Sequence, residues 1–228
     1  MTVARARPPK ARPSKARPSL SRELIAATAL RLTREEPNMP LTLTRLGVEL
    51  AADPTAIYRH YRSREELLVD LFELTYSEVL DRFEPGGDWR SSLNHVGHAM
   101  RAALLVRPAL VAEVGHRFTG GPHEQEAICV TREMFRSAGL SDHESNQQVR
   151  VFGEMILANV MMSAATMSAQ PEVQLSELEL AARVYGVEVS SMQTYDHDTF
   201  TMMLDTYFDG LAARVRVARR SRPSRGTT

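Results

Sequence analysis

The sequence predicts an all-helical protein in which a small N-terminal domain is followed by a larger helical domain. Apolar residues recur at spacings of three and four through most of the chain, which is the period of an amphipathic helix. Ser, Thr or Asp stands where these segments begin, and Pro or Gly stands where they end. No segment alternates convincingly with the period of two that a strand requires, although residues 187–189 are predicted to be briefly extended.

The composition allows a sizeable core, because 43% of the 228 residues are hydrophobic. A single cysteine, Cys129, excludes an internal disulfide and a cysteine-based zinc cluster. No apolar run approaches the roughly 18 residues of a membrane span. The basic N-terminus lacks the apolar stretch of a signal peptide. We therefore expect a soluble, cytoplasmic protein.

The net charge is zero, but the charges are segregated along the chain. Residues 1–20 carry six basic side chains and no acid, and residues 211–228 do the same. Residues 41–64 carry four arginines against two acids, whereas residues 85–210 carry 8 arginines and 16 acids. A protein that contacts a polyanion with one part of its surface has this distribution. Tails that only solubilise the chain are the alternative.

The N-terminal elements follow from caps and prolines. Residues 1–19 are rich in Pro, Arg and Ala without apolar periodicity, and they are predicted to form a disordered basic arm. Ser21 is the expected N-cap of a first helix that runs to about Glu36 and ends before a proline. Thr42 is the expected N-cap of a second, short helix that ends near Leu50.

A turn at residues 51–53 is predicted to lead into a third helix that runs to about Tyr61. Pro54 suits the first turn of this helix, where a missing backbone N–H costs nothing. Ser63 and Glu66 have the spacing of a capping box, which predicts the start of a fourth, longer helix. That helix should continue to about residue 82 and end before a Pro-Gly-Gly loop.

Six further helices are predicted in the remaining part of the chain, with Asp88, Ser141 and Asp196 as possible N-caps. They are expected near residues 89–105, 109–118, 123–138, 142–169, 176–186 and 197–218. The predicted domains are 20–66 and 67–218, followed by a disordered basic tail at 219–228.

The second and third helices, with the turn between them, have the layout of a helix-turn-helix, which places its second helix in the major groove of DNA. The outer face of such a helix must be small or polar near its start. Thr55 can donate to a phosphate or a base edge, and the Ala56 methyl group can contact a thymine methyl group. Arg59 can reach a phosphate or a guanine edge, while Ile57 and Tyr61 are expected to turn inward.

Phosphate contacts are expected on both sides of this helix. Tyr58 and His60 place donors at its flanks, although either residue taken alone is equally compatible with an ordinary surface role. The start of the preceding helix offers hydroxyl and backbone N–H groups, and its positive end favours an anion. Such contacts position a protein, whereas base contacts specify sequence. The predicted DNA-binding residues are Thr42, Thr44, Arg45, Pro54, Thr55, Ala56, Tyr58, Arg59, His60 and Arg64.

These residues resemble the DNA-binding domain of the TetR (tetracycline repressor) family of transcriptional regulators over about residues 21–72. The family pattern is L-T-x-x-x-L-A-x-x-L, a turn, [LI]-Y-x-H-[FYV] and x-[SN]-[KR]-x-x-L-L. It is matched here by Leu41-Thr42, Leu46, Leu50, the segment IYRHY at 57–61 and the segment SREELL at 63–68. The resemblance implies a homodimer, and usually a repressor that a small molecule releases from its operator.

The chain departs from the family pattern at two positions. The turn usually carries Gly, but Ala51 stands there. If this position needs a left-handed conformation, Ala is strained. Arg64 replaces the commoner Lys, which still permits a phosphate contact but with a different shape.

Residues 88–218 are similar to the helical effector-binding and dimerisation domain of the same family. Methionines are plentiful there, and flexible thioethers suit a pocket for varied apolar ligands, as they suit a plain core. Polar side chains on the same helices can orient a ligand. The predicted pocket residues are His95, His98, Met100, His116, Met134, Met155, Asn159 and Met162. The effector is expected to be a small, largely apolar molecule.

The helices near 142–169 and 197–218 are predicted to pair with their mates across a twofold axis as a four-helix bundle. The predicted interface residues are Val151, Ala158, Phe200, Leu204, Phe208 and Leu211. An intrachain core is the alternative for both stripes, because periodicity alone does not separate a core from an interface.

No cofactor, metal site or catalytic site is predicted. His95 and His98 lie on one helical face, but no carboxylate completes a zinc ligand set in that motif. A Gly-rich phosphate loop, a nucleophile elbow and an HExxH motif are all missing from the sequence. The sequence thus favours a homodimeric repressor that binds a palindromic operator. An activator on the same fold remains open. So does a helical small-molecule- or partner-binding protein with weakened DNA binding.

Overall fold

The computed structural model describes residues 20–84, 87–167, 171–186, 188 and 190–221. The described residues form ten α-helices and no strand, so the predicted all-helical class is confirmed. The predicted arm at 1–19 lies outside the described residues. So do parts of the predicted loop at 85–87, of the extended stretch at 187–189 and of the tail at 219–228.

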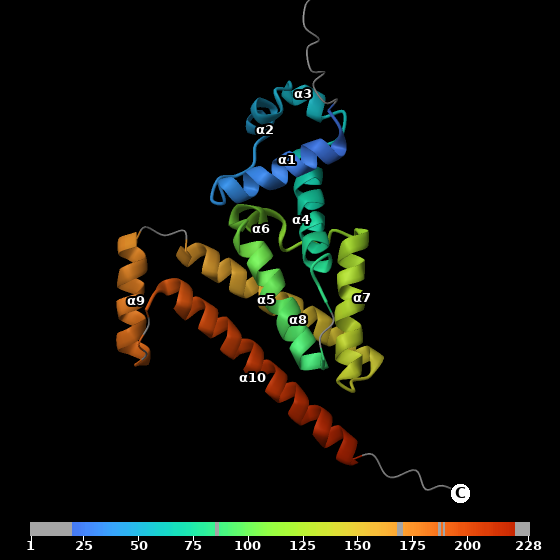
Figure 1. Ribbon diagram of the computed structural model, residues 1–228, viewed down its shortest axis with the longest axis vertical. Coiled ribbons are helices and arrows are strands. Elements are labelled where there is room, and N and C mark those ends of the chain that lie inside the picture. Colours follow the sequence, from blue (N-terminus) through green and yellow to red (C-terminus); the bar gives the residue numbers. More distant parts are fainter. Residues whose placement is uncertain (1–19, 85–86, 168–170, 187, 189, 222–228) are drawn as a thin grey trace, which may run out of the picture.

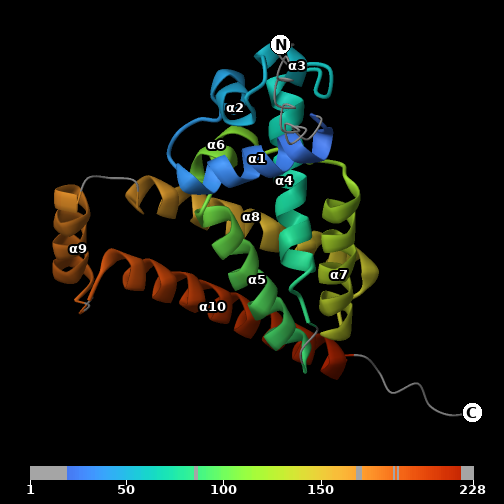
Figure 2. The same ribbon diagram turned by 45° about the horizontal axis from the view of Figure 1, so that its top comes forward.

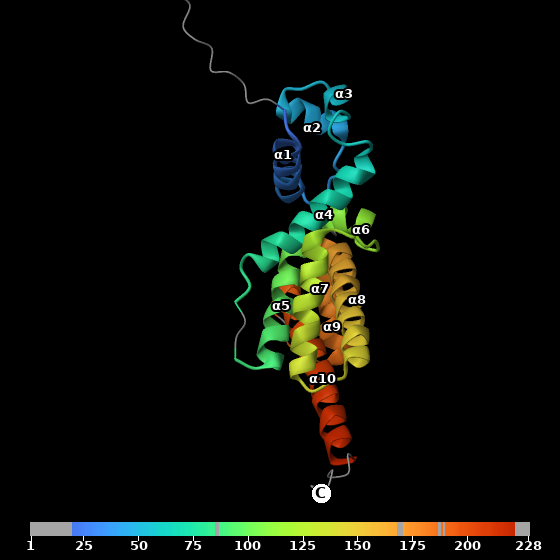
Figure 3. The same cartoon turned by 90° about the vertical axis from the view of Figure 1, so that its right-hand side faces the viewer.

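The described helices form an elongated molecule (Figure 1). Their bounds are α1 Arg22–Glu35, α2 Leu43–Leu50, α3 Pro54–Ile57, α4 Arg64–Leu80, α5 Trp89–Leu105, α6 Pro108–Val114, α7 Pro122–Ser137, α8 Asp142–Met167, α9 Pro171–Tyr185 and α10 Met192–Ser221. Helices α1, α2 and α3 lie together at one end, and α4 runs from them into the larger helical part (Figures 1 and 3). The predicted division between the domains at residues 66 and 67 falls within α4 and remains a prediction.

Three of the predicted N-caps of the first four helices are made by the residues expected. The hydroxyl oxygens of Ser21, Thr42 and Ser63 each accept a hydrogen bond from the backbone N–H three residues on, at 3.2, 3.2 and 3.0 Å. Each bond satisfies a donor that the first helical turn leaves unpaired. The capping box at α4 differs in one detail, because the Glu66 carboxylate accepts from the backbone N–H of Arg62, at 2.8 Å. The local sequence thus fixes where these helices start.

The third helix is shorter than predicted. α3 covers Pro54–Ile57, and the chain continues to Tyr61 as a hydrogen-bonded turn. The N–H of Arg59 donates to the carbonyl three residues back, as does the N–H of His60, at 3.3 and 2.9 Å. Bonds of this spacing tighten the backbone relative to an α-helix. The inward positions are as predicted, since Ile57 and Tyr61 are buried.

Ala51 ends α2 in the left-handed conformation, with φ 48° and ψ 42°. It is the one non-glycine among the described residues with a positive φ. This conformation is unfavourable for an L-residue because its Cβ crowds the backbone, and glycine has no Cβ. The turn does need a left-handed residue at position 51, so Ala51 is strained there. Gly47 adds a second constraint to this turn, since a Cβ there would lie 2.8 Å from the Ala52 carbonyl oxygen.

Replacing Ala51 with glycine is expected to stabilise the protein by about 0.5–1 kcal/mol. Removing Cβ relieves a left-handed cost of roughly 1–2 kcal/mol, of which the greater freedom of glycine in the unfolded chain cancels part. Urea unfolding of the full chain, monitored by circular dichroism, measures the change. Ala52→Gly is the matched control, because Ala52 has no positive φ. It should lower the stability. If both variants lose stability alike, Ala51 does not hold the left-handed conformation in solution.

The larger helical part is organised around α5, α8 and α10, with α7 packed against α4 and α8. Figure 2 shows α5 running across α8 and α10, and α9 set apart near the start of α10. Phe152 of α8 and Trp89 of α5 both meet the Phe208 ring of α10, with ring centroids 6.0 and 5.9 Å apart. Aromatic pairs of this kind add to the burial of their area.

Four of the predicted interface residues are core residues instead. Phe200, Leu204 and Phe208 are fully buried within one chain, and Leu211 is 4% exposed. Their side chains already pack against the protomer's own helices, so they present no surface to a partner chain. The alternative of an intrachain core, which periodicity left open, is the correct one for this stripe. Val151 and Ala158 of α8 do lie on the surface.

Several predicted helix ends also need correction. α10 starts at Met192, where the Ser191 hydroxyl oxygen accepts from the N–H of Thr194 at 3.1 Å. Asp196, a predicted cap, lies inside the helix, where it pairs with a buried arginine. α6 ends at Val114, four residues earlier than expected. α9 starts at Pro171, five residues earlier than expected. Proline is tolerated in a first helical turn, which explains the last difference.

Candidate functional site

The outer side of α3 and of the turn after it carries the exposed polar groups that the sequence singled out. The side chains of Thr55, Tyr58 and Arg59 are exposed, and that of Tyr58 retains 53% of its accessible area. Within the described part of the chain, the Arg59 guanidinium has no ion-pair partner. Figure 3 places α3 at the far end of the molecule from α10. This surface is therefore open to a large ligand such as a duplex.

Asp53 organises the start of α3. Its carboxylate accepts from the backbone N–H of Thr55 at 2.8 Å and from the Thr55 hydroxyl group at 2.7 Å. These two bonds lower the pKa of Asp53. Because the hydroxyl hydrogen of Thr55 is engaged by Asp53, the oxygen is left as an acceptor for a base or a water. The role of Thr55 as a donor, considered from sequence, would require this bond to break.

Tyr61 anchors the turn after α3 to the rest of the domain. Its hydroxyl group donates to the Asp70 carboxylate at 2.5 Å, and the Arg22 guanidinium lies over its ring at 4.1 Å. Burial raises the pKa of Tyr61, and the bond to Asp70 raises it further. Arg22 also donates to the His60 carbonyl oxygen at 3.1 Å. Helices α1 and α4 thus hold the exposed side chains of α3 in place.

Two arginines in the predicted DNA-binding set are engaged within the protein. Arg45 pairs with Glu36 at 2.9 Å. The Arg64 guanidinium donates to both carboxylate oxygens of Glu113 at 2.5 and 2.7 Å, which raises the pKa of Arg64. These arginines reach a phosphate only by leaving their partners. Thr42 and Thr44 are exposed at the start of α2, whereas Pro54, Ala56 and His60 are partly buried.

Ion pairs connect the helix-turn-helix end to the larger helical part. Glu113 of α6 holds Arg64 at the start of α4, and Arg117, just after α6, pairs with Glu65. The second connection centres on Arg107, which is fully buried at the junction of α5 and α6. It donates to the Glu78 carboxylate of α4 at 2.9 and 2.7 Å, and Glu78 also accepts from Arg34 of α1 at 2.7 Å. A shift of α6 would therefore displace the residues of α4 and α1 that form these ion pairs.

The residues predicted to line an effector pocket are dispersed. His95 and His98 border a hollow on α5 together with Asp88 and Arg90. The remaining six line neither this hollow nor the cavity that lies where the two parts of the molecule meet. Met134 is buried, Met100, Met155 and Asn159 are partly buried, and His116 and Met162 are exposed.

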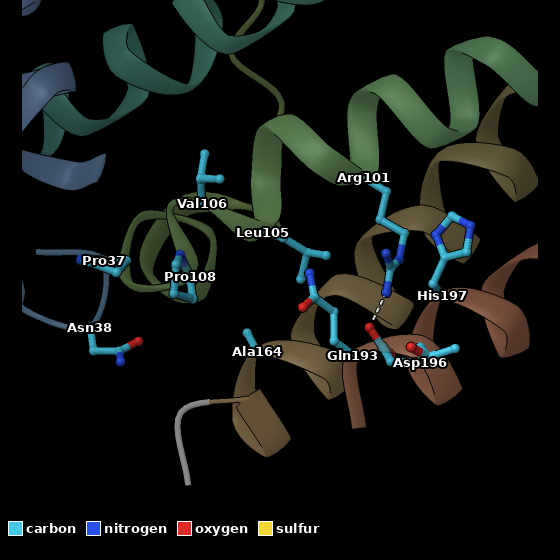
Figure 4. Close-up of a pocket in the computed structure, with 11 residues that line it drawn as sticks. Pro37, Asn38, Arg101, Leu105, Val106, Pro108, Ala164, Gln193, Asp196 and His197 are labelled. Atoms are coloured by element: carbon cyan, nitrogen blue, oxygen red, sulfur yellow. Dashed lines mark hydrogen bonds and ion pairs between the residues drawn. The ribbon is translucent and has the colours of Figure 1, made fainter. Parts of the chain in front are cut away.

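A cavity of about 570 Å³ lies instead where the two parts of the molecule meet (Figure 4). Its wall includes Pro37 and Asn38 from the loop between α1 and α2, Leu105 of α5 and Ala164 of α8. Gln193 and other residues at the start of α10 close the opposite side. The volume is in the range of small-molecule sites, roughly 300–1,000 Å³. We name this space the junction cavity.

A buried polar cluster forms one side of the junction cavity. Arg101 of α5 is 6% exposed and forms an ion pair with Asp196 of α10. It donates to the Asn159 side-chain oxygen at 2.6 Å, and its guanidinium lies 4.9 Å from the Phe200 ring centroid. The Ser163 hydroxyl group donates to Asp196 as well. The cluster satisfies the buried charge of Arg101 and ties the start of α10 to α5 and α8.

The described residues show no arrangement of three or more His, Cys, Asp or Glu side chains that would hold a metal ion. In the same part of the chain, no helix combines the length and the apolar character needed to cross a membrane.

Comparison with solved structures finds this fold in transcriptional regulators. ActR from Streptomyces coelicolor, in complex with actinorhodin, is 21% identical, with a TM-score of 0.68 over 86% of this chain and 98% of that chain. A TetR variant from Acinetobacter baumannii AYE, in complex with minocycline, is 21% identical, with a TM-score of 0.64 over 92% and 100%. BioQ with its double-stranded DNA operator is 21% identical, with a TM-score of 0.61 over 86% and 99%. The comparison with protein-family models found no match, and neither did that with curated proteins.

The fold therefore defines an all-helical class in which a helix-turn-helix end is joined to a larger helical domain. Its particular form is the fold of the TetR-family transcriptional regulators, as the resemblance of residues 21–72 implied.

Proposed function

We propose that the protein is a homodimeric, sequence-specific repressor that a small molecule releases from its operator. The observation that carries the DNA-binding part is the exposed set Thr55, Tyr58 and Arg59 on a firmly anchored helix-turn-helix. A helix presented in this way fits a major groove, and its flanking groups fit phosphates. The fold supports the proposal, because one matched structure, BioQ, is described with its operator and another, ActR, with a small molecule.

The dimer is proposed to form through the outer faces of α8 and α10. On α8, Val151, Ala158 and Met162 recur at helical spacing and are exposed, with Met162 73% exposed. On α10, Met202 is 67% exposed and Val217 65% exposed. A contiguous exposed apolar patch marks an interaction surface, and the row on α8 is the part of this surface that supports the assignment. Two such helices from each chain would make a four-helix bundle.

Replacing Met162 with glutamate is expected to convert the dimer to a monomer at micromolar concentration. The side chain is already solvated in the single chain, so the helix content should not change, whereas a charge would be buried in the interface without a partner. Light scattering after size-exclusion chromatography gives the mass. Ser91→Glu, at an exposed position in the first turn of α5, controls for the added charge outside this row. A dimer that persists in Met162→Glu would exclude this part of α8 from the interface.

Effector release requires that the ligand bind a DNA-incompetent arrangement better than the DNA-bound one. α4 is the proposed lever, because it starts beside α3 and continues into the larger helical part. The ion pairs Arg64–Glu113 and Arg107–Glu78 couple α4 to α6. A change around α6 would then alter the spacing of the two recognition helices in the dimer.

The Tyr58→Phe variant is expected to bind all DNA sequences about 30-fold more weakly. It loses one phosphate hydrogen bond in each subunit, and each such bond contributes on the order of 1 kcal/mol. The salt dependence of binding should decrease slightly. Fluorescence anisotropy with specific and random duplexes measures both effects. Unchanged affinity for both duplexes would remove Tyr58 from the contact set.

Selection of bound duplexes from a random pool, at about 0.15 M salt where nonspecific binding is largely screened, tests the proposed function. A recovered palindrome supports a sequence-specific dimer, and its half-site spacing gives the dimer geometry. No enrichment, from folded and dimeric protein, would favour the second candidate, a helical small-molecule- or partner-binding protein with weakened DNA binding. The strained Ala51 turn is the observation in favour of that candidate.

A further inference from the structure

The junction cavity differs from a pocket inside the helical domain, because the DNA-binding end supplies part of its wall. Pro37 and Asn38 belong to the loop between α1 and α2 (Figure 4). This loop is held against α6 by a hydrogen bond from the Ala109 N–H to the Pro37 carbonyl oxygen at 3.2 Å. The opposite wall is the start of α10, the helix whose outer face we assign to the dimer. An occupant would contact both.

The wall combines apolar surface with groups that donate and accept hydrogen bonds. Leu105, Pro108 and Ala164 supply part of the apolar surface. Besides Arg101 and Asp196, the polar part comes from Asn38, Gln193, Thr194 and His197. A molecule that fits has an apolar body and a few polar ends.

The charge of the wall selects among such molecules. Arg101 and Asp196 are the two lining residues with a permanent charge, and they neutralise each other in an ion pair. An ionised ligand would bring a charge with no free counter-charge, and it would lose water in doing so. An uncharged ligand avoids this cost and can still hydrogen-bond to the polar ends.

We propose that the junction cavity binds an uncharged small molecule with an apolar body and hydrogen-bonding ends, and that this molecule contacts the α1–α2 loop directly. The inference rests on the proposed function for its regulatory meaning, since it places the effector there. A ligand in this position stabilises the orientation of the DNA-binding end in which it contacts Pro37 and Asn38 best. By linkage, DNA and the ligand change each other's affinity by the same factor.

The test uses two dyes that share one aromatic body. N-phenyl-1-naphthylamine is uncharged, and 8-anilinonaphthalene-1-sulfonate adds a sulfonate group to it. With the full-length protein, we expect saturable fluorescence enhancement by the uncharged dye at one site per chain, and at least tenfold weaker binding of the sulfonate. Equal or tighter binding of the sulfonate would overturn the assignment of an uncharged ligand.

Blocking variants locate the site. Ala164→Trp fills the cavity from α8, and Gln193→Trp does so from a position at the start of α10 that is less demanding for folding. Each variant should lower the affinity for the uncharged dye at least tenfold. Ala112→Trp, on the exposed side of α6, should leave this affinity unchanged. Melting curves show which variants are folded. If Gln193→Trp is folded and binds the dye like the original chain, the site is not the junction cavity.

Contact with the DNA-binding end is tested separately. Asn38→Ala should lower the affinity for the uncharged dye at least threefold. An unchanged affinity would overturn the proposed contact with the α1–α2 loop. Duplex selection distinguishes the two proposals. Enriched DNA without dye binding would reject the cavity site and leave the DNA-binding function standing. Dye binding that the blocking variants abolish, without DNA enrichment, would reject the proposed function and leave the cavity site standing.

Discussion

Replacing Arg107 with methionine is expected to lower the free energy of unfolding by about 3–5 kcal/mol, because it breaks a buried ion pair from one side. The Arg107 side chain is fully buried. It donates to both Glu78 carboxylate oxygens and to the Ala103 carbonyl oxygen at 2.7 Å. Burial lowers the pKa of Arg107, and Glu78 opposes this change. Without the guanidinium, Glu78 keeps only its bond to the more exposed Arg34.

Urea unfolding at a fixed protein concentration measures this effect, since a dimer's stability depends on concentration. Arg136→Met is the matched control. Arg136 also faces two carboxylates, Glu133 and Asp142, but at the surface, where such pairs contribute about 0–1 kcal/mol. The double variant Arg107→Met, Glu78→Met should recover part of the loss, because no buried charge is left unpaired. Arg34, which loses its bond to Glu78, is 44% exposed. A loss below about 1 kcal/mol in Arg107→Met would show that this ion pair does not hold α4 to the α5–α6 junction.

The helix starts are the most predictable part of the fold, since they depend on neighbours in the sequence. Ser21, Thr42, Asp88 and Ser141 are all predicted caps, and each accepts a hydrogen bond from a nearby backbone N–H. The inward positions of α3 follow equally from local spacing. The predicted cap at Asp196 is wrong because the role of this residue depends on Arg101, which lies 95 residues away in the sequence.

The ion-pair partners of the arginines in the candidate site lie far away in the sequence, so the sequence does not predict which arginines are engaged. Arg64 has the position of a phosphate contact, but Glu113, 49 residues away, holds it. The sequence does contain one signal of the buried polar cluster. Arg101 occupies the buried stripe of α5 between Gly97 and Leu104, and a charge on such a stripe implies a buried partner. The junction cavity has no such signal, because Pro37 and Gln193 are brought together only by the packing of the two domains.

The wrong assignment of Phe200, Leu204 and Phe208 has a related cause. A long helix that is apolar on one face gives the same pattern whether that face meets its own chain or another. Burial in the single chain separates the two cases, and it leaves small and flexible side chains of α8 and α10 for the proposed dimer. The sequence therefore identifies the helices that we assign to the dimer, but not the face of α10.

The Arg59→Ala variant is expected to lose at least about 30-fold in affinity for a selected operator. Arg59 is exposed next to α3 and has no ion-pair partner among the described residues, unlike Arg45 and Arg64. A bidentate bond to a base contributes about 1–3 kcal/mol, and a dimer makes it twice, so the expected loss of binding free energy is about 2–6 kcal/mol. Fluorescence anisotropy at constant salt measures it.

The pattern of the loss identifies the atom that Arg59 binds. If it binds a guanine edge, the variant loses affinity for the operator much more than for random DNA, and repeated selection shows a relaxed preference at one position. If it binds a phosphate, both duplexes weaken alike, and the salt slope decreases by about one for each phosphate that is no longer neutralised. Arg136→Ala removes the same charge from α7 and should change neither affinity. Equal affinities for Arg59→Ala and the original chain would mean that the outer side of the turn after α3 does not enter the groove.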